Sequence, residues 1–213
     1  MKQMPGAEVY SLTQNESWKL AAEKLAEIHL AFWQGRSAYA NALQQLHGSS
    51  MFTRRLQQAY ENSCSRKAWK DFSDKVMERL QDAPKTLVHG DLFPSNILID
   101  EQNVCFVDWA DAAISGYMLD IGRLTATIDI TTMKPMCPCE DEVIRAYYNK
   151  RKDRLAMNDS DYLRDIHAAQ FIELCNSYQP MRAFGVNQKY NELLEQRIDR
   201  IVAAELSYYT RIH

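Results

Sequence analysis

A short stretch near the middle of the chain combines residue types that phosphoryl-transfer chemistry uses. His89-Gly90-Asp91 follows an apolar pair, and four residues separate Asp91 from Asn96. Asp108 comes twelve residues after Asn96, directly behind the apolar run 104–107. An Asp-x4-Asn segment followed by an Asp at the end of a strand has the spacing of a phosphoryl-transfer catalytic loop and its metal-binding Asp.

Each of these side chains has a chemical task in such a reaction. A carboxylate beside the acceptor hydroxyl orients it and takes its proton, and Asp91 stands at the loop position for that role. Mg²⁺ prefers oxygen ligands, which the Asn96 amide and the Asp108 carboxylate would supply. We expect His89 to shape the loop by hydrogen bonding and Gly90 to adopt a backbone conformation that a side chain would oppose. Singly, these residues fit an ordinary turn and a helix N-cap, but their joint occurrence favours a site.

Composition and charge are those of an ordinary soluble globular protein. The 213 residues are 46% hydrophobic and 25% charged, and the net charge is −3. This balance gives no basic footprint for nucleic acid or for an anionic membrane. The sequence has no signal-peptide pattern and no run of 18 apolar residues, which predicts a cytoplasmic protein. Five cysteines without a regular framework are expected to be reduced structural thiols.

Hydrophobic periodicity predicts a mostly helical chain with one small buried hairpin. The first helix is expected from an N-cap at Ser17 to about Gly35, with His29 as a hydrogen-bonded core residue. Further helices are expected as two within 49–80, broken near 62–65, one from about 120 to 128, and three over 140–154, 159–178 and 188–213. The charged residues of the 49–80 helices, including Arg54 and Arg55, are expected on solvated faces.

The hairpin positions the proposed chemistry. Segments 97–99 and 104–107 are apolar and rich in β-branched residues, and the polar segment 100–103 forms the turn between them. A hairpin fixes the separation of the groups at its open end, here Asn96 and Asp108. Residues 109–117 are expected to form a loop, and 134–139, with two prolines, a break.

Three segments resemble the aminoglycoside phosphotransferase and choline kinase-like family, namely His89 to Leu98, Phe106 to Trp109, and Gly116 to Leu124. The helix containing His29 is also similar to the family's first large-lobe helix. The resemblance implies a protein-kinase-like fold, ATP and Mg²⁺ as cofactors, Asp91 as catalytic base, and Asn96 and Asp108 as metal ligands. Asp120 matches a later Asp that braces the catalytic loop, and a helix N-cap is the open alternative.

The chain departs from that family before the catalytic loop. Such proteins have an N-terminal lobe of strands with a Gly-rich loop, a strand Lys and a helix Glu that hold the nucleotide. The residues before position 87 have helical patterns, and Gly6, Gly35 and Gly48 are isolated. We therefore expect an α+β, mostly α fold: a kinase-like large (C-terminal) lobe with a small β-hairpin, without its N-terminal β lobe. The expected parts of this single lobe, 1–213, are a hinge-like segment 1–15, catalytic and metal-binding loops 86–124, and a helical substrate-side subdomain 140–213.

The function implied is transfer of a γ-phosphoryl group from ATP, or another nucleoside triphosphate, to a hydroxyl of an aminoglycoside, choline, an amino alcohol or a similar small molecule. Activity is expected to be incomplete without the N-terminal lobe. The acceptor-binding residues stay unassigned; acidic residues that could meet a cationic acceptor, mostly expected on the surface, are Asp111, Asp129, Glu140, Asp141, Glu142 and Glu173. Aromatic residues that could cage a quaternary ammonium, or simply belong to the core, are Trp109, Tyr147, Tyr148 and Tyr178.

Two other functions remain open. A non-catalytic binding or regulatory module would keep the lobe fold and would self-associate, or bind a partner, through the apolar surface left by the missing lobe. A metal-dependent hydrolase using Asp91 and Asp108 is weaker, because no cluster of His ligands accompanies them.

Overall fold

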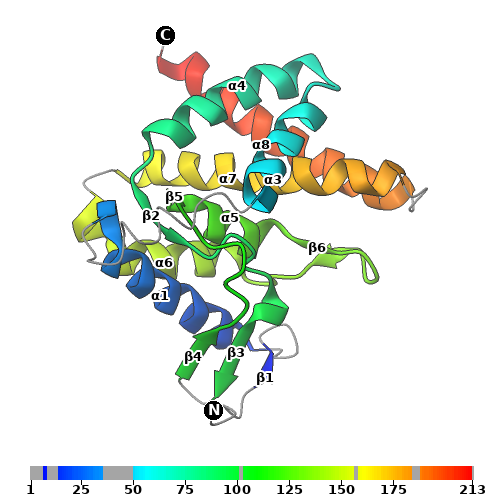
Figure 1. Ribbon diagram of the computed structural model, residues 1–213. Coiled ribbons are helices and arrows are strands. Elements are labelled where there is room, and N and C mark those ends of the chain that lie inside the picture. Colours follow the sequence, from blue (N-terminus) through cyan, green and yellow to red (C-terminus); the bar gives the residue numbers. More distant parts are fainter. Residues whose placement is uncertain are drawn as a thin grey trace.

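The computed structural model describes residues 7–8, 14–35, 50–100, 103–155, 158–183 and 188–212 (Figure 1). The expected hinge-like segment 1–15 falls largely outside these residues. Over the described residues the chain is mostly helical with small antiparallel sheets, as the sequence predicted. None of the helices in the described ranges is long and apolar enough to cross a membrane.

The helices lie close to their predicted positions. They are α1 (Asn15–Ala31), α3 (Ser50–Ser63), α4 (Lys67–Asp82), α5 (Met118–Ala126), α6 (Glu140–Leu155), α7 (Asp159–Ala183) and α8 (Gln188–Ile212), with short 3₁₀ helices η2 (Trp33–Gly35) and η3 (Pro94–Asn96). The prediction of Ser17 as N-cap is wrong, because α1 begins earlier and Gln14 is its N-cap. The Ser17 backbone N–H instead donates to the Gln14 carbonyl at 3.1 Å, so Ser17 lies in the first turn.

Three small antiparallel sheets accompany the helices. The predicted hairpin is confirmed as β3 (Ile97–Asp100) and β4 (Asn103–Phe106), and β1 (Ala7–Glu8) adds to its β3 edge. The prediction of a loop over 109–117 is wrong in part, because β5 (Ala113–Gly116) pairs with β2 (Lys85–Val88). This pairing joins strands from distant parts of the chain, so no local turn signals it. The third sheet joins β6 (Ile128–Asp129) to β7 (Lys134–Pro135), where the sequence had predicted the end of a helix and a break.

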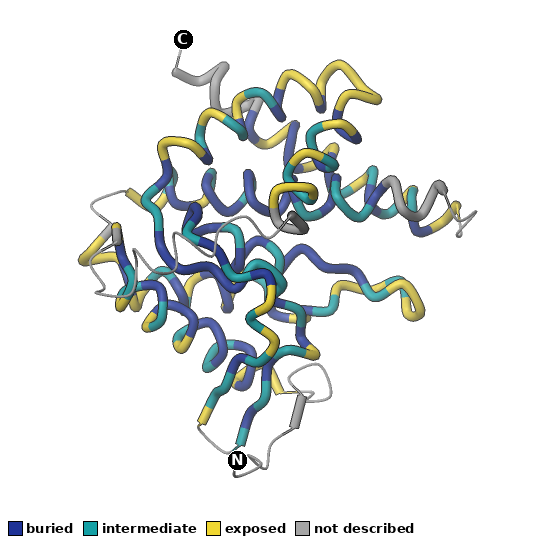
Figure 2. Tube along the Cα trace, viewed as in Figure 1, coloured by how far each residue is buried: buried dark blue, intermediate teal, exposed yellow. Residues whose placement is uncertain are grey.

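Helix α7 runs through the centre of the molecule (Figure 1). Helices α4 and α8 lie on one side of it, and α5, α6 and α1 lie on the other. The dark-blue buried positions in Figure 2 follow the facing sides of these helices and the strands β2 and β5. The largest fully buried side chains include Trp18, Trp69, Tyr117 and Phe171, so one continuous core holds the β2–β3 connection in place.

At Gly122, α5 packs closely against α7. A Cβ at this position would lie 2.4 Å from the Ala169 Cβ and 2.7 Å from the Ala169 carbonyl carbon. We expect Gly122→Ala to lower the free energy of unfolding by about 1–3 kcal/mol through this overlap, although Ala favours a helix. Urea denaturation measures the loss, and adding Ala169→Gly should restore part of it. An unchanged or higher stability of Gly122→Ala would contradict the close approach.

Candidate active site

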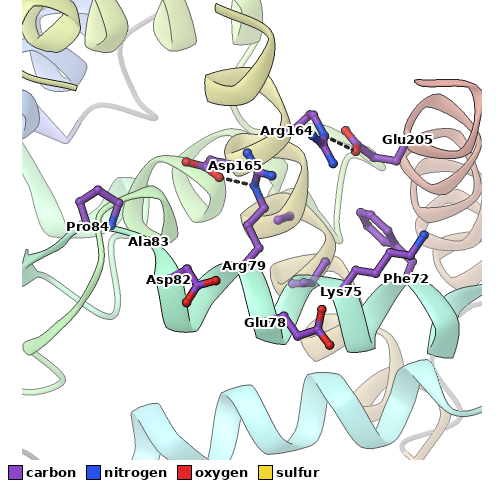
Figure 3. A pocket seen from close by; sticks show the side chains of 12 residues that line it. Phe72, Lys75, Glu78, Arg79, Asp82, Ala83, Pro84, Arg164, Asp165 and Glu205 are labelled. Carbon is purple, nitrogen blue, oxygen red and sulfur yellow. Dashed lines mark hydrogen bonds and ion pairs between the residues drawn. The ribbon is translucent and has the colours of Figure 1, made fainter. Parts of the chain in front are cut away.

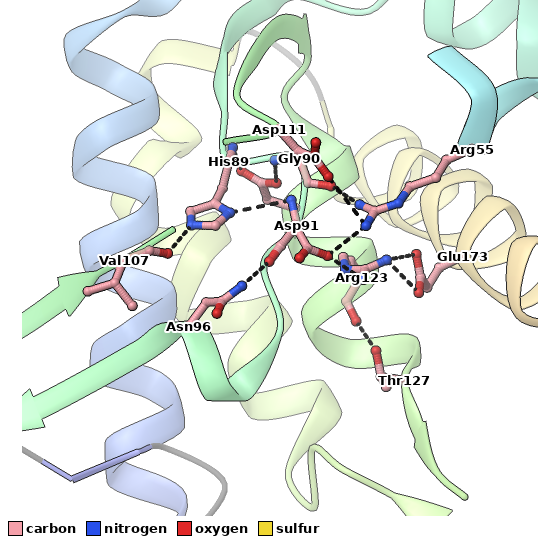
Figure 4. Close-up of polar contacts among 11 residues, drawn as sticks. Arg55, His89, Gly90, Asp91, Asn96, Val107, Asp111, Arg123, Thr127 and Glu173 are labelled. Atoms are coloured by element: carbon pink, nitrogen blue, oxygen red, sulfur yellow. Dashed lines mark hydrogen bonds and ion pairs between the residues drawn. The ribbon is translucent and has the colours of Figure 1, made fainter. Parts of the chain in front are cut away.

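The loop from His89 to Asn96 connects β2 to β3 and contains η3 (Figure 4). Gly90 has φ +79°, a left-handed conformation that favours glycine. A Cβ at Gly90 would lie 2.2 Å from the carbonyl oxygen of Asp111, so a side chain has no room there either. The loop therefore turns sharply just before Asp91, and this turn fixes the backbone position from which the Asp91 side chain extends.

The Asp120 carboxylate stabilises this turn by hydrogen bonds to its backbone. It accepts the backbone N–H groups of His89 at 2.6 Å and Gly90 at 3.0 Å, and the His29 Nε2 lies 3.2 Å away. Asp120 is the third residue of α5, whose N-cap is Tyr117. Burial alone would raise the pKa of Asp120, but hydrogen bonds from His29 and the His89 backbone outweigh it and lower the pKa. The buried carboxylate is thus ionised and shared between the loop and α1.

His29 links this carboxylate to a buried polar group deeper in the core. Its Nδ1 lies 2.6 Å from the Tyr147 hydroxyl, which in turn accepts a hydrogen bond from Arg151. The buried Arg151 guanidinium lies over the rings of Trp33, at 4.1 Å, and Tyr117, at 4.7 Å. Burial lowers the pKa of His29 more than Asp120 raises it. We therefore assign a neutral imidazole that donates from Nε2 to Asp120, which confirms the prediction of a hydrogen-bonded core histidine.

His29 is expected to make the fold sensitive to acid. In the unfolded chain a histidine takes up a proton near pH 6.5, whereas the folded state keeps His29 neutral to a lower pH. The unfolded state then binds more protons, so stability falls as pH decreases below about 6.5, by up to about 1.4 kcal/mol per pH unit for this group. Urea unfolding between about pH 7.5 and 5 should show a shallower decline for His29→Gln than for wild type. Equal slopes for His29→Gln and wild type would contradict this prediction.

Asp91 is held by two arginines from distant helices (Figure 4). Its Oδ1 lies 2.9 Å from Arg55 Nη2 and 2.6 Å from Arg123 Nη2. Arg55 also donates to the Gly90 carbonyl at 2.5 Å and lies 3.4 Å from Asp111. Both guanidinium groups use the same oxygen, and Oδ2 has no partner among the described residues. One oxygen of Asp91 is therefore anchored while the other stays available to a hydroxyl.

The two arginines were not predicted as site residues. Arg55 was expected on a solvated face, which is wrong: its half-buried side chain reaches from α3 to Asp91 in the loop 89–96. Arg123, on α5, also binds both oxygens of Glu173 at 2.8 and 2.7 Å. Its position inside the segment Gly116 to Leu124 was the only sequence signal, and nothing local distinguishes Arg55 from its charged neighbours.

Asn96 and Asp108 flank the open end of the β3–β4 hairpin, one at the end of each strand. The Asn96 Nδ2 donates to the Asp91 carbonyl at 2.9 Å, so the amide oxygen, Oδ1, points elsewhere. The Val107 N–H donates to the Asn96 carbonyl at 2.9 Å, which extends the pairing and places Asp108 next. Asp108 is exposed and has φ +62°, a conformation uncommon for a residue with a side chain. Neither the Asp108 carboxylate nor the Asn96 Oδ1 has a hydrogen-bond partner among the described residues.

His89 ties the loop to that same end of the hairpin. Its Nε2 lies 2.8 Å from the Val107 carbonyl and its Nδ1 accepts the Asp91 N–H at 3.3 Å. The ring also packs against Trp109, with centroids 4.6 Å apart. Through these contacts His89 connects the backbone at Asp91 to the end of the hairpin, where the Asn96 amide oxygen and the Asp108 carboxylate lie.

The two oxygen ligands at the hairpin end, from Asn96 and Asp108, suit a hard cation that takes its remaining ligands from elsewhere. An amide oxygen and a carboxylate are ligands that Mg²⁺ accepts, and Mg²⁺ usually completes its shell with water and phosphate oxygens. No cluster of three His, Cys, Asp or Glu side chains suited to a metal ion occurs in the described part of the chain. A metal held by Asn96 and Asp108 would therefore depend on a phosphate ligand, as metals in phosphoryl-transfer sites do.

A pocket of about 650 Å³ lies against the arginines that hold Asp91. It opens between helices α3, α5, α7 and α8, and its lining includes Arg54, Arg55, Phe93, Arg123, Thr127, Asp129, Glu173, Asn176 and Tyr190. Of the acidic residues considered from sequence, Asp129 and Glu173 line it. The aromatic residues Tyr147 and Tyr178 are buried in the core and do not line this pocket.

A second pocket of about 490 Å³ lies between α4, α7 and α8 (Figure 3). Four of its charged side chains form two ion pairs: Arg79 pairs with Asp165, and Arg164 with Glu205 at 3.1 Å. Its lining shares no described residue with the catalytic loop or the hairpin end. This pocket is therefore not the candidate active site.

Comparisons with known proteins identify the family and the fold. The model of the phosphotransferase enzyme family matches residues 1–156. An aminoglycoside phosphotransferase from Alicyclobacillus acidocaldarius is 14% identical with a TM-score of 0.52, and the match covers 98% of this chain and 70% of that one. An ethanolamine kinase from Plasmodium vivax is also 14% identical, with a TM-score of 0.50, and the match covers 93% of this chain and 63% of that one. No curated protein sequence matches the chain.

Proposed function

Because the chain belongs to the phosphotransferase enzyme family, we propose that it transfers the γ-phosphoryl group of ATP, or of another nucleoside triphosphate, to a hydroxyl of a small molecule. The observation that carries this proposal is the grouping of Asp91, Asn96 and Asp108 where the catalytic loop meets the hairpin. A base for a hydroxyl and two hard oxygen ligands are the parts that phosphoryl transfer needs from the protein.

We assign Asp91 the part of catalytic base. Its Oδ1 is fixed by Arg55 and Arg123, so its Oδ2 is the oxygen that would accept a hydrogen bond, and then the proton, from the acceptor hydroxyl. Asn96 and Asp108 would hold Mg²⁺, which neutralises charge on the phosphate oxygens when it is bound. This assignment uses the Asp91 Oδ2, the Asn96 Oδ1 and the Asp108 carboxylate, which have no hydrogen-bond partner among the described residues.

Asp120 and His89 act as positioning residues in this proposal. Asp120 fixes the backbone of the turn through two N–H groups, and His89 joins the turn to the end of β4. The separation between Asp91 and the hairpin end then depends on hydrogen bonds to backbone atoms. Such second-layer contacts preserve the geometry that the reacting groups need.

Nucleotide binding by the described residues is proposed to be incomplete. In kinase-like enzymes a Gly-rich loop and a strand Lys cover and clamp the phosphates, and the described ranges contain no such pair of elements. We propose that 86–124 supply the catalytic and metal-binding loops, that 140–213 supply helices on the acceptor side, and that an N-terminal lobe completes the clamp. Slow turnover by this chain follows from that proposal.

The test is ADP formation by the full chain with Mg²⁺ and ATP and a panel of hydroxyl compounds. We expect slow, acceptor-dependent ADP formation that Asp108→Asn abolishes. Asp100→Asn is the matched control, because Asp100 lies at the other end of the same hairpin and pairs with Asn103. Equal rates for wild type and Asp108→Asn would contradict the proposal, and absence of nucleotide binding would favour the non-catalytic module.

A further inference from the structure

The pocket beside Asp91 is lined by more cationic than anionic groups. Its described charged residues are the arginines Arg54, Arg55 and Arg123 and the acids Asp129 and Glu173. Arginine guanidinium groups recognise carboxylates and phosphates through paired, planar hydrogen bonds. Arg55 and Arg123 are paired with Asp91 and Glu173, so Arg54 is the arginine of the described lining whose charge is not already matched by a carboxylate of the protein.

The two acids of the pocket are already engaged within the protein. Glu173 is bound through both oxygens by Arg123, at 2.8 and 2.7 Å, and its burial raises its pKa. The Asp129 Oδ1 accepts the backbone N–H groups of Thr131 at 2.7 Å and Thr132 at 3.1 Å. These contacts use the carboxylates to hold α5 and the turn between β6 and β7. A cationic acceptor would have to compete with Arg123 for Glu173, whereas Asp129 keeps its Oδ2 and its negative charge, because the backbone hydrogen bonds lower its pKa.

The aromatic residues of the pocket do not form a cage for a quaternary ammonium. The face of Phe93 is covered by the Arg123 guanidinium, whose Cζ lies 5.4 Å from the ring centroid. Tyr190 is 4% exposed, and its hydroxyl donates to the Ile128 carbonyl at 3.3 Å. A quaternary ammonium binds over several open ring faces. The described lining of this pocket does not offer such a set.

Arg54 supplies the free positive charge. It is exposed, lies next to Arg55 on α3, and has no ion-pair or hydrogen-bond partner among the described residues. Gln58, from the same helix, and Asn176 and Ser177, from α7, add neutral hydrogen-bonding groups to the wall. We propose that the acceptor carries an anionic group, a carboxylate or a phosphate, which Arg54 and Arg55 bind while its hydroxyl approaches Asp91. This inference rests on the proposed phosphoryl transfer at Asp91 and adds the chemical class of the acceptor.

Four small hydroxyl compounds test this selectivity in the absence of nucleotide and metal. They are D-glycerate, which carries a carboxylate, glycerol 3-phosphate, which carries a phosphate, neutral glycerol, and cationic choline. Titration of the full chain, followed by calorimetry or NMR, should show one of the two anions binding at least about 10-fold more tightly than glycerol and choline. The stronger anion identifies whether the pocket takes a carboxylate or a phosphate.

Two matched variants locate the binding. Arg54→Gln should weaken binding of the preferred anion about 10-fold or more. Arg145→Gln removes the same charge from an exposed position on α6 that does not line the pocket, and should leave binding unchanged. The inference is overturned if neither anion shows saturable binding, or if choline or glycerol binds as tightly as the preferred anion. It is also overturned if Arg54→Gln and Arg145→Gln have the same effect on binding of that anion.

These titrations are independent of the transfer reaction. If an anion binds in a way that depends on Arg54 but the chain shows no ATP turnover, the anion site is supported and the proposed function is contradicted. Phosphoryl transfer to choline without any binding of the anions would keep the proposed function and remove the anion site.

Discussion

Replacing Asp91 with Asn should lower the rate of phosphoryl transfer by about 10²–10⁴-fold, the usual contribution of a general base. An amide at this position cannot take the proton of the acceptor hydroxyl. The variant should remain folded, because Arg55 keeps Asp111 at 3.4 Å as a partner and Arg123 keeps Glu173. ADP formation measures the rate, and thermal denaturation measures the stability of the same sample.

The matched control for Asp91→Asn is Asp111→Asn. It makes the same chemical change at the other carboxylate that contacts Arg55. The Asp111 Oδ2 lies 3.4 Å from the Arg55 Nη2. We expect Asp111→Asn to retain most of the activity, because Arg55 keeps its hydrogen bonds to Asp91 and to the Gly90 carbonyl when Asp111 loses its charge. Equal losses in the two variants would show that the negative charge around Arg55 matters and would contradict the assignment of Asp91 as base.

Replacing Asp120 with Ala should destabilise the fold by several kcal/mol. The substitution leaves three donors without their acceptor: the backbone N–H groups of His89 and Gly90, and the Nε2 of His29. An unsatisfied buried donor costs about 1–3 kcal/mol. Urea denaturation gives the total, and faster hydrogen exchange at the His89 and Gly90 amides would show where the loss arises.

Asp120→Asn is the graded comparison. Its amide keeps one oxygen that can accept a backbone N–H, so it should be less destabilising than Asp120→Ala. A loss below about 1 kcal/mol for Asp120→Ala would contradict the hydrogen bonding of the loop through this carboxylate.

Local patterns were sufficient for the helices and the catalytic hairpin. The apolar spacing around Leu25 and His29 predicted α1, and the two apolar runs after Asn96 predicted β3 and β4. These elements bury one face each, so their periodicity is visible in a single segment. The same reasoning placed Asn96 beside Asp108, since a hairpin brings its two ends together.

The features that sequence analysis missed depend on contacts between distant segments. Strand β5 is only Ala113–Gly116, and its partner β2 precedes the whole catalytic loop. Arg55 has the surroundings of a surface residue in the sequence, and only the packing of α3 against α7 brings it to Asp91. Arg151 lies in a strongly charged helix, and its burial follows from the rings of Trp33 in η2, Tyr117 just before α5 and Tyr147 in α6 itself. No local pattern contains that information.

The arginines also change what the sequence suggested about the acceptor. The family resemblance pointed to aminoglycosides and choline, which carry positive charge. The pocket next to Asp91 presents Arg54, Arg55 and Arg123 instead, and of its two acids Glu173 is bound through both oxygens by Arg123. In the proposed reaction, specificity of this kind would depend on the helices around the pocket, whereas Asp91, Asn96 and Asp108 would serve any hydroxyl.

Binding of Mn²⁺–ATP to the full chain, followed by electron paramagnetic resonance, tests the metal-binding role of the hairpin end most directly. Mn²⁺ replaces Mg²⁺ at oxygen sites and reports its own coordination. We predict saturable binding to wild type and to Asp100→Asn, and binding at least about 10-fold weaker to Asp108→Asn. Equal binding to Asp108→Asn and wild type, or no binding to wild type, would contradict a phosphotransferase site built on Asp91, Asn96 and Asp108.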